Sequence, residues 1–321
     1  GVQTPHIIRD ALAKNILHIE PKSLRVISPD VGGGFGLKAS AQRELALVLW
    51  ASKVIGRPVR WISDRTESFI GDHHARDNLS RVSLALDTSG KFLGLRVKTL
   101  ANLGAYIDTF GLHIPIGNIG GLSGPYSIKS FDIEVKGIFT NTQPTAPYRG
   151  AGRPEATYCI ERIVDKAAKK LGLDPVEIRK RNMIPPSDMP YDTGLVFQYD
   201  CGQFEKTMDK ALQLADFDNK KARTKKARSR GRIHGTGLAY AVEIAGGPQN
   251  SPLSEYAEIS FNPTGNAVVK VGTHNHGQGH ETAFRQILSY TLGIDPKRTQ
   301  ILYGDTSVVT KGTGTFGSRS V

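Results

Sequence analysis

Gly32-Gly33-Gly34-Phe35-Gly36 follows a strand-like segment at residues 24–28, and two comparable glycine-rich stretches occur far along the chain. They are Tyr148-Arg149-Gly150-Ala151-Gly152-Arg153-Pro154-Glu155-Ala156, and Gly277-Gln278-Gly279-His280-Glu281-Thr282-Ala283, which opens a predicted helix. Glycine lets backbone N–H groups approach a ligand without hindrance from a Cβ atom. At the start of a helix, unpaired N–H groups also favour an anion. The three stretches therefore predict one extended, anionic ligand that is contacted from several sides.

Two common phosphate-binding motifs do not fit the first stretch. A phosphate loop needs a hydroxyl residue after its lysine, whereas Ala39 follows Lys38 here. The GxGxxG dinucleotide fingerprint, with an acidic residue about 20 positions later, is also not matched. Taken alone, the stretch is more typical of a tight turn packed against a helix, so the functional interpretation depends on the whole set of motifs.

Two more segments complete the set: Val2-Gln3-Thr4-Pro5-His6, and Gly312-Thr313-Gly314-Thr315-Phe316-Gly317-Ser318-Arg319-Ser320. In its order along the chain, the set resembles the molybdenum-cofactor subunit of the molybdenum hydroxylases, the family of xanthine dehydrogenase, aldehyde oxidase and carbon monoxide dehydrogenase. The resemblance runs from residue 3 to residue 320. It implies catalytic roles at the metal pocket for Gln3 and Arg149, and no direct protein ligand to molybdenum. It further implies a cofactor-binding set consisting of Gly34, Phe35, Gly36, Arg149, Gly150, Ala151, Gly277, Gln278, Gly279, His280, Thr313, Thr315, Ser318 and Ser320.

Three departures from the family pattern bear on the substrate. Carbon monoxide dehydrogenases carry a copper-bridging cysteine where this chain has Gly150, and xanthine-oxidising relatives carry a stacking phenylalanine at the position of Ala151. A glutamate of the latter group corresponds to Ala39. The chain is therefore most similar to the carbon monoxide dehydrogenase-like branch with the AYRGAGR signature, whose natural substrate the motif does not reveal.

The resemblance implies an oxidoreductase that hydroxylates a carbon of an aldehyde or N-heterocycle with water-derived oxygen. The implied cofactor is molybdopterin with molybdenum, as the cytosine dinucleotide. Electrons would leave through two 2Fe-2S clusters on a small subunit and FAD on a medium subunit, in a dimer of heterotrimers. The family's general-base glutamate has no counterpart here, so we expect a central fragment of about two-fifths of the subunit, inactive in isolation, or alternatively a naturally split subunit. The competing interpretation is a non-catalytic anion- or nucleotide-binding module.

Composition excludes several other classes. The net charge is +12, but residues 220–232 hold eight Lys and Arg and no acid, without the interleaved aromatics that stack on bases. We therefore expect no nucleic-acid partner. No apolar run is long enough to span a membrane. Cys159 and Cys201 form no recognisable metal or disulfide pattern, which is typical of a cytoplasmic protein.

The pattern of apolar residues predicts an α+β fold with mixed sheets and packed helices. Residues 1–219 and 233–321 are predicted as two molybdopterin-binding domains, truncated at the N- and C-terminus respectively, joined by the basic linker 220–232. The predicted helices are 6–17, 41–55 (expected to be buried), 154–171, 174–182, 203–215 and 279–293. The predicted strands are 59–62, 82–86, 92–97, 131–139, 235–242, 256–261, 268–271 and 299–303. Both hairpins turn on an Asx-x-Thr/Ser-Gly sequence. This weak internal repeat suggests two similar α+β halves, although convergent turn chemistry explains it about as well.

His274, His276 and His280 are candidate zinc ligands, since two histidines on one face of a strand can bind a metal. Because no carboxylate or cysteine completes a set at a fixed offset, a directly bound metal is not expected.

Overall fold

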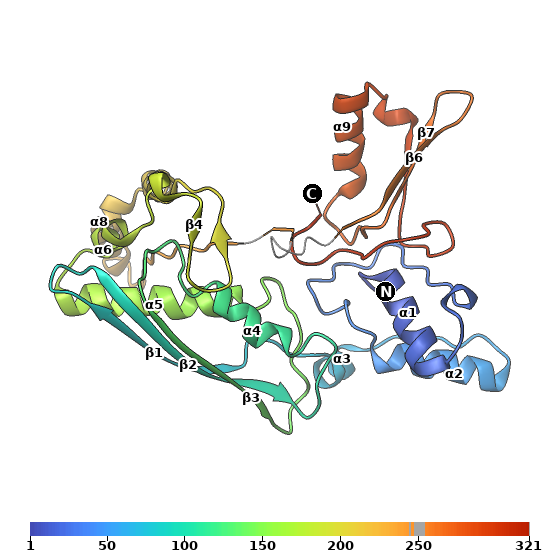
Figure 1. Ribbon diagram of the computed structural model, residues 1–321, viewed down its shortest axis with the longest axis horizontal. Helices are drawn as coiled ribbons and strands as arrows, with labels where there is room; N and C mark the ends of the chain where they lie inside the picture. The colour runs from blue at the N-terminus through green and yellow to red at the C-terminus, as the bar shows by residue number, and fades with distance from the viewer. Residues whose placement is uncertain (244, 247–253, 321) are drawn as a thin grey trace.

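The computed structural model describes residues 1–243, 245–246 and 254–320. Helices and two mixed three-stranded sheets confirm the predicted α+β class. Figure 1 shows the larger sheet with its helices in one part of the molecule, and the smaller sheet standing above the N-terminal helices in the other. The N-terminal segment and the last residues lie together between the two sheets.

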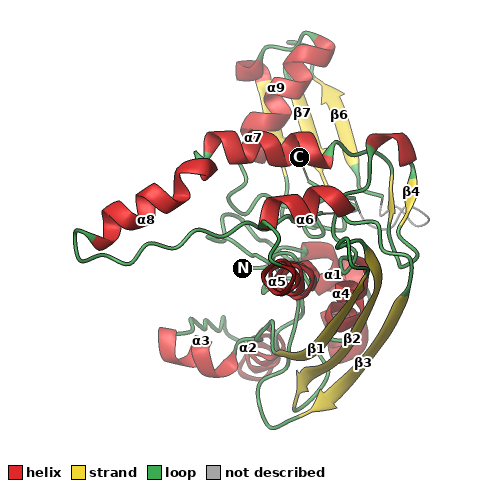
Figure 2. Cartoon of the chain, turned by 90° about the vertical axis from the view of Figure 1, so that its left-hand side faces the viewer, coloured by secondary structure: helices red, strands yellow, loops and turns green. Residues whose placement is uncertain are grey.

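The larger sheet has the order β1-β2-β3, and its strands are β1 (Asn78–Leu86), β2 (Phe92–Gly104) and β3 (Phe131–Phe139). β1 and β2 are antiparallel, and β3 runs parallel to β2. Helix α5 (Arg153–Leu171) packs on this sheet, as Figure 2 shows from the side. The main core lies between them, because Leu95 and Val97 of β2 and Ile160 and Val164 of α5 are all buried.

The smaller sheet repeats this topology with β6 (Ala257–Phe261), β7 (Ala267–Val271) and β8 (Thr299–Leu302). β6 and β7 are antiparallel, and β8 runs parallel to β7. A helix lies in each crossover to the third strand, α4 (His113–Gly120) in the first case and α9 (His280–Leu292) in the second. The two halves of the chain therefore share a strand order as well as a hairpin-turn sequence.

The two hairpin turns use the same hydrogen bonds. Asp87 accepts from the hydroxyl of Ser89 and from the backbone N–H of Lys91 through one carboxylate oxygen. Asn262 accepts from the backbone N–H of Asn266 and from the hydroxyl of Thr264. Such side-chain contacts stabilise a tight turn locally, and they fix the register of each hairpin.

The N-terminal helices form a third, small cluster. Helix α1 (Pro5–Ala11) continues as a π-helix over Leu12–Leu17, and α2 (Arg43–Ile55) packs beside them. The prediction that α2 is buried is wrong, because none of its residues is buried and Trp50 is 61% exposed. Only one side of the helix, with Leu45 and Leu49, packs on the small cluster, so its other apolar side chains face outward.

Several further predictions are corrected by the structure. Residues 59–62 and 235–242 form no strand, and the segment 24–28 contributes only an isolated bridge between Ile27 and Asp305. The sequence pattern missed α3 (Arg65–Gly71) and α4. Helices α6 (Pro175–Asn182) and α7 (Phe204–Leu214) form as predicted.

The basic run forms helix α8 (Lys220–Arg228), which has no buried residue. The chain that follows it, with Leu238, Tyr240 and Val242, packs on the main core rather than beside the smaller sheet. The division of the chain into two molybdopterin-binding domains around residues 220–232 stays a prediction.

A buried ionic network ties this segment to the core. Arg179 is fully buried and donates to one carboxylate oxygen of Glu161 at 2.9 and 2.8 Å, to Asp165 at 2.8 Å and to the carbonyl of Leu238 at 3.1 Å. Tyr126 donates to the other oxygen of Glu161 at 2.6 Å. Burial raises the pKa of Glu161, while the guanidinium opposes this effect. The network joins α5 and α6 to the chain after α8.

Candidate functional site

Five loops far apart in the sequence meet at one cavity of about 430 Å³. They come from the N-terminus, the first glycine-rich stretch, the loop before α5, the loop before α9 and the last residues of the chain. The cavity brings together most of the residues singled out from the sequence: Gln3, Phe35, Gly36, Arg149, Gly150, Ala151, Gly277, Gln278, Thr315, Ser318 and Ser320.

The backbone around this cavity is strained. Phe35, Ala151 and Ser318 have positive φ values of 55°, 45° and 53°, although none is a glycine. This conformation costs energy for residues with a Cβ atom and persists where the surrounding structure enforces it, often at functional sites. The neighbouring Gly36 has φ 107°, and a Cβ atom there would lie 2.3 Å from the carbonyl oxygen of Pro147. The chain thus needs a glycine at this point of close approach.

Gln3 is buried, and its side chain forms hydrogen bonds to both the first glycine-rich loop and the last loop. Its Nε2 donates to the carbonyl of Thr315 at 2.7 Å, and its Oε1 accepts from the backbone N–H of Gly36 at 3.1 Å. Its own backbone N–H donates to the carbonyl of Lys38, and its carbonyl accepts from the N–H of Thr315. In this arrangement the N–H of Gly36 is engaged by the protein.

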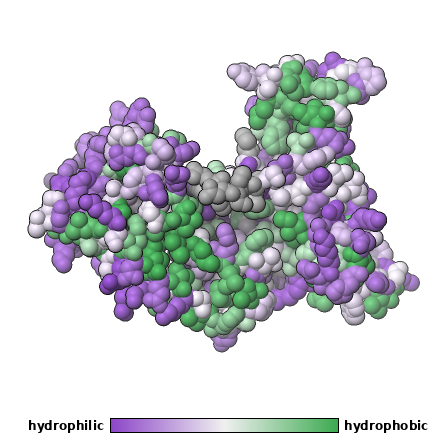
Figure 3. Space-filling view, viewed as in Figure 1, coloured by the Kyte–Doolittle hydropathy of each residue, from purple (hydrophilic) through white to green (hydrophobic). Residues whose placement is uncertain are grey.

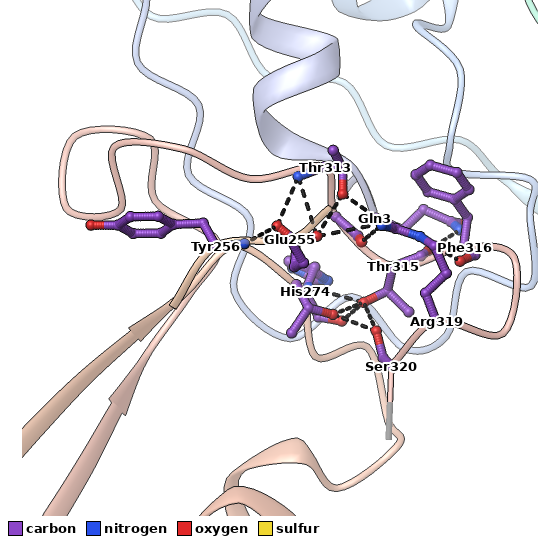
Figure 4. Close-up of polar contacts among 11 residues, drawn as sticks. Gln3, Glu255, Tyr256, His274, Thr313, Thr315, Phe316, Arg319 and Ser320 are labelled. Carbon is purple, nitrogen blue, oxygen red and sulfur yellow. Dashed lines mark hydrogen bonds and ion pairs between the residues drawn. The ribbon is translucent and has the colours of Figure 1, made fainter. Parts of the chain in front are cut away.

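Thr315 is the centre of a second set of contacts, drawn in Figure 4. Its hydroxyl accepts from the backbone N–H of His274 at 3.0 Å and lies 2.7 Å from the carbonyl of the same residue. It also lies 2.6 Å from the hydroxyl of Thr273 and 3.1 Å from that of Ser320. These contacts hold the last loop against the loop before α9.

The carboxylate of Glu255 forms further hydrogen bonds to the last loop. Glu255 accepts from the backbone N–H of Thr313 at 3.1 Å and from its hydroxyl at 2.6 Å. Arg319 lies 3.5 Å from that carboxylate and stacks over the ring of Phe316. Figure 4 shows these groups converging from the loop before β6 and the last loop. Thr313 is thus occupied in shaping the cavity rather than in lining it.

The side chain of Gln278 contacts the imidazole of His276, which in turn contacts that of His274. Its Oε1 accepts from the backbone N–H of His276 at 2.7 Å, and its Nε2 lies 3.3 Å from Nε2 of the same residue. Nδ1 of His276 lies 3.5 Å from Nδ1 of His274, whose Nε2 lies 2.7 Å from the carbonyl oxygen of Ser28. Burial, and then the neighbouring histidines, lower the pKa of His276 to about 4.

The charges at the cavity favour an anionic ligand. Arg149, Arg153 and Arg319 line it, and no acidic residue is among the described lining residues. Arg153 pairs with Glu243 and Arg319 with Glu255. Within the described part of the chain, the guanidinium of Arg149 has no ion pair or hydrogen bond, so its fork of donors is available to an oxyanion.

Besides Thr313, three predicted residues lie beside the cavity instead of lining it. Gly34 lines an adjacent cavity of about 510 Å³, on the other side of Phe35. Gly279 caps α9 with φ 79°. His280 is buried and stacks on Phe284, and both of its ring nitrogens lack a hydrogen-bond partner in the described structure.

Other lining residues were not predicted as part of the site: Pro147, Tyr148, Arg153, His276, Phe316, Gly317 and Arg319. Most of them belong to the same glycine-rich motifs, so widening each motif by one or two residues would have found them. The sequence pattern marks His276 only as a candidate metal ligand. Among the described residues, no group of three or more His, Cys, Asp or Glu side chains is arranged to hold a metal ion.

Comparison with known proteins points to one family. A family model described as a molybdopterin cofactor-binding domain matches residues 1–183, and a second model of the same description matches residues 210–321. The chain is 37% identical over 331 aligned residues to the carbon monoxide dehydrogenase large chain of Hydrogenophaga pseudoflava, covering 99% of this chain and 41% of the relative. It is 32% identical to subunit gamma of the 6-hydroxypseudooxynicotine dehydrogenase complex of Paenarthrobacter nicotinovorans, covering 100% of this chain and 40% of the relative.

Solved structures give the same result. Quinoline 2-oxidoreductase from Pseudomonas putida 86 matches with a TM-score of 0.91 and 31% identity, over 99% of this chain and 42% of that one. A Cu,Mo-CO dehydrogenase matches with a TM-score of 0.89 and 32% identity, over 99% and 42% of the two chains. The chain therefore spans about two-fifths of the length of the proteins it matches.

Proposed function

This chain belongs to the family of molybdopterin cofactor-binding domains, and on that premise we propose that it forms the cofactor site of a molybdenum-dependent hydroxylase. The reaction we propose is hydroxylation of a carbon of an aldehyde or N-heterocycle with water-derived oxygen. Relatives with such names, quinoline 2-oxidoreductase and nicotine 6-hydroxylase, support this choice. The proposal rests on the convergence of five separate loops on one cavity, where the guanidinium of Arg149 has no ion pair or hydrogen bond with the described residues.

The residues at the cavity fit a molybdopterin. Gly277 and Gly279 have φ values of 121° and 79°, and a Cβ atom at either position would meet nothing within 4 Å. They leave open space for an extended ligand, whereas Gly36 and Gly314 are required by the packing of the protein itself. We propose that Gln278, Ser318 and Ser320 hold the pterin and its dinucleotide extension, and that Arg149 and the backbone of Phe35 face the metal. When bound, the cofactor supplies the metal centre for the oxidation.

We propose that the substrate approaches from the adjacent cavity. Phe35 and Tyr148 line both cavities, and Phe69 and His73 line the adjacent one. Aromatic faces at the entrance suit a planar ring such as an N-heterocycle. No carboxylate among the described residues lines the cofactor cavity, so the general base of the reaction is expected from outside this chain.

Carbon monoxide is not the substrate we propose. Gly150, the position of the copper-bridging cysteine in the family pattern, has φ 94°, and a Cβ atom there would lie 2.5 Å from Cγ of Pro154. The backbone of this loop thus accommodates glycine, and no thiolate is present to bind soft Cu(I).

The finer cofactor and partners also belong to this proposal. The pterin would be the cytosine dinucleotide, and FAD and 2Fe-2S clusters would sit on a medium and a small subunit of a dimer of heterotrimers in the cytoplasm. No helix in the described part of the chain is long and apolar enough to cross a membrane.

Metal and pterin analysis of the complete subunit, purified with its partners, tests the proposal. We expect molybdenum and pterin near parity with the subunit and no stoichiometric copper. We also expect less molybdenum in an Arg149→Ala variant, and unchanged content in an Arg81→Ala variant, whose side chain lies on β1 away from the cavity. Binding of a free nucleotide without molybdenum or pterin would instead favour the non-catalytic module.

A further inference from the structure

A continuous row of polar groups runs from the carbonyl of Ser28 to the side chain of Gln278. The carbonyl oxygen lies 2.7 Å from Nε2 of His274, Nδ1 of His274 lies 3.5 Å from Nδ1 of His276, and Nε2 of His276 lies 3.3 Å from Nε2 of Gln278. His274 is fully buried, and the two imidazoles are nearly parallel, with an angle of 20° between their planes. The row crosses from the first glycine-rich region to the loop before α9.

The chemistry of each group fixes the position of every hydrogen in this row. A backbone carbonyl only accepts, so Nε2 of His274 carries the hydrogen. A neutral imidazole has one N–H, so Nδ1 of His274 is bare and must accept from Nδ1–H of His276. Nε2 of His276 is then bare, and it accepts from an N–H of Gln278. Burial lowers the pKa of both histidines, which keeps the rings neutral.

A second, independent contact gives the same orientation of the Gln278 amide. Its Oε1 accepts from the backbone N–H of His276 at 2.7 Å, which requires oxygen at that end of the side chain. The nitrogen must then face the imidazole, as the row of histidines also demands.

We infer that Ser28, His274 and His276 are positioning residues, which hold the amide of Gln278 so that it presents an N–H to the cofactor cavity. Gln278 lines that cavity, and one of its two Nε2 hydrogens is used by His276. The other hydrogen is the donor left for an acceptor in the cavity, such as an oxygen or sulfur of the cofactor. Only the identity of this acceptor rests on the proposed function, because the orientation itself is set by contacts within the chain.

The tautomers of the two histidines test the inference without any substitution. In long-range ¹H–¹⁵N NMR spectra of the full chain at neutral pH, a protonated ring nitrogen and a bare one give separate signals. We expect Nε2–H on His274 and Nδ1–H on His276. An Nε2–H tautomer of His276, or a doubly protonated ring on either residue, would overturn the inference that these histidines orient the Gln278 amide.

A matched pair of variants tests its effect on the amide. His276→Phe keeps a planar ring beside His274 but removes the acceptor, so hydrogen exchange of the Gln278 side-chain NH₂ should accelerate roughly fivefold, as expected for one lost hydrogen bond. His234→Phe removes an imidazole that contacts Thr224, away from the cavity, and should leave this exchange rate unchanged. Equal rates in wild type and His276→Phe would contradict the inference.

These results separate the inference from the proposed function. The expected tautomers of His274 and His276, found in a complete protein that contains no molybdopterin, would support the orientation of the Gln278 amide and refute the cofactor proposal. Molybdopterin in a protein whose His276 carries the other tautomer would do the reverse.

Discussion

Replacing Gln3 by methionine tests whether this residue holds the cavity together. The two side chains have similar length, so the change removes the amide while largely keeping the packing. It leaves the carbonyl of Thr315 and the N–H of Gly36 without their partners at 2.7 and 3.1 Å. Each unsatisfied buried group costs about 1–3 kcal/mol. Because both groups border the cavity, water can reach them, and we expect the lower part of the summed range, about 2–3 kcal/mol.

Urea unfolding at neutral pH measures this change in the free energy of unfolding. Gln300→Met is the matched control, because Gln300 is exposed on β8 and its side chain has no hydrogen bond in the described structure. We expect the control to change stability by less than about 0.5 kcal/mol. Equal stability of Gln3→Met and wild type would refute the view that Gln3 links the two loops.

Three further predictions concern other parts of the fold. Gly36→Ala should destabilise by more than about 3 kcal/mol in urea unfolding, through positive φ and a backbone clash, whereas Gly56→Ala, with φ 66° and open space around it, should cost only about 1–2 kcal/mol; similar losses would show that the clash is relieved. Glu161→Gln should cost about 3–5 kcal/mol in the same assay, because it leaves the buried Arg179 without its main charge partner; a loss below about 1 kcal/mol would contradict this. The pKa of His276 is depressed to about 4 in the folded protein. Its unfolded value is about 6.5, so the unfolded state binds more protons and stability should fall as pH drops from about 7 towards 4. This pH dependence should weaken in His276→Phe, and an unchanged profile in thermal unfolding would count against the assignment.

Local patterns in the sequence were sufficient for much of the fold. The alternation of apolar residues and the Asp87 turn predicted the β1–β2 hairpin, and the periodicity of residues 154–171 predicted α5. Both elements carry their signal within a short stretch, and both bury the apolar face that the pattern defines.

The errors arise where tertiary contacts decide the outcome. The apolar character of α2 shows which side chains could be buried but not what covers them, and Trp50 remains exposed. Leu238 and Tyr240 occupy alternate positions, as in a strand. They pack on the main core, but this segment does not pair with any strand of a sheet. Figure 3 likewise shows hydrophobic side chains gathered over the smaller sheet and α9, where Tyr290 is 95% exposed.

Each motif of the candidate site was predicted from the sequence, but the hydrogen bonds between the motifs were not. The glycine-rich stretches signalled ligand contact individually, and the fold brings them to one cavity. The role of His276 depends on a contact between His274 and Ser28, which are 246 positions apart. No local pattern contains that information.

We propose that the cavity formed by these five loops holds a molybdenum cofactor. Anomalous X-ray scattering at the molybdenum edge, from crystals of the complete subunit purified with its cofactor, tests it most directly. We predict a single strong peak per subunit within the cavity bordered by Phe35, Arg149 and Gln278. A molybdenum peak elsewhere in the molecule, or protein that contains molybdopterin but gives no peak in this cavity, would show that the cofactor does not bind here.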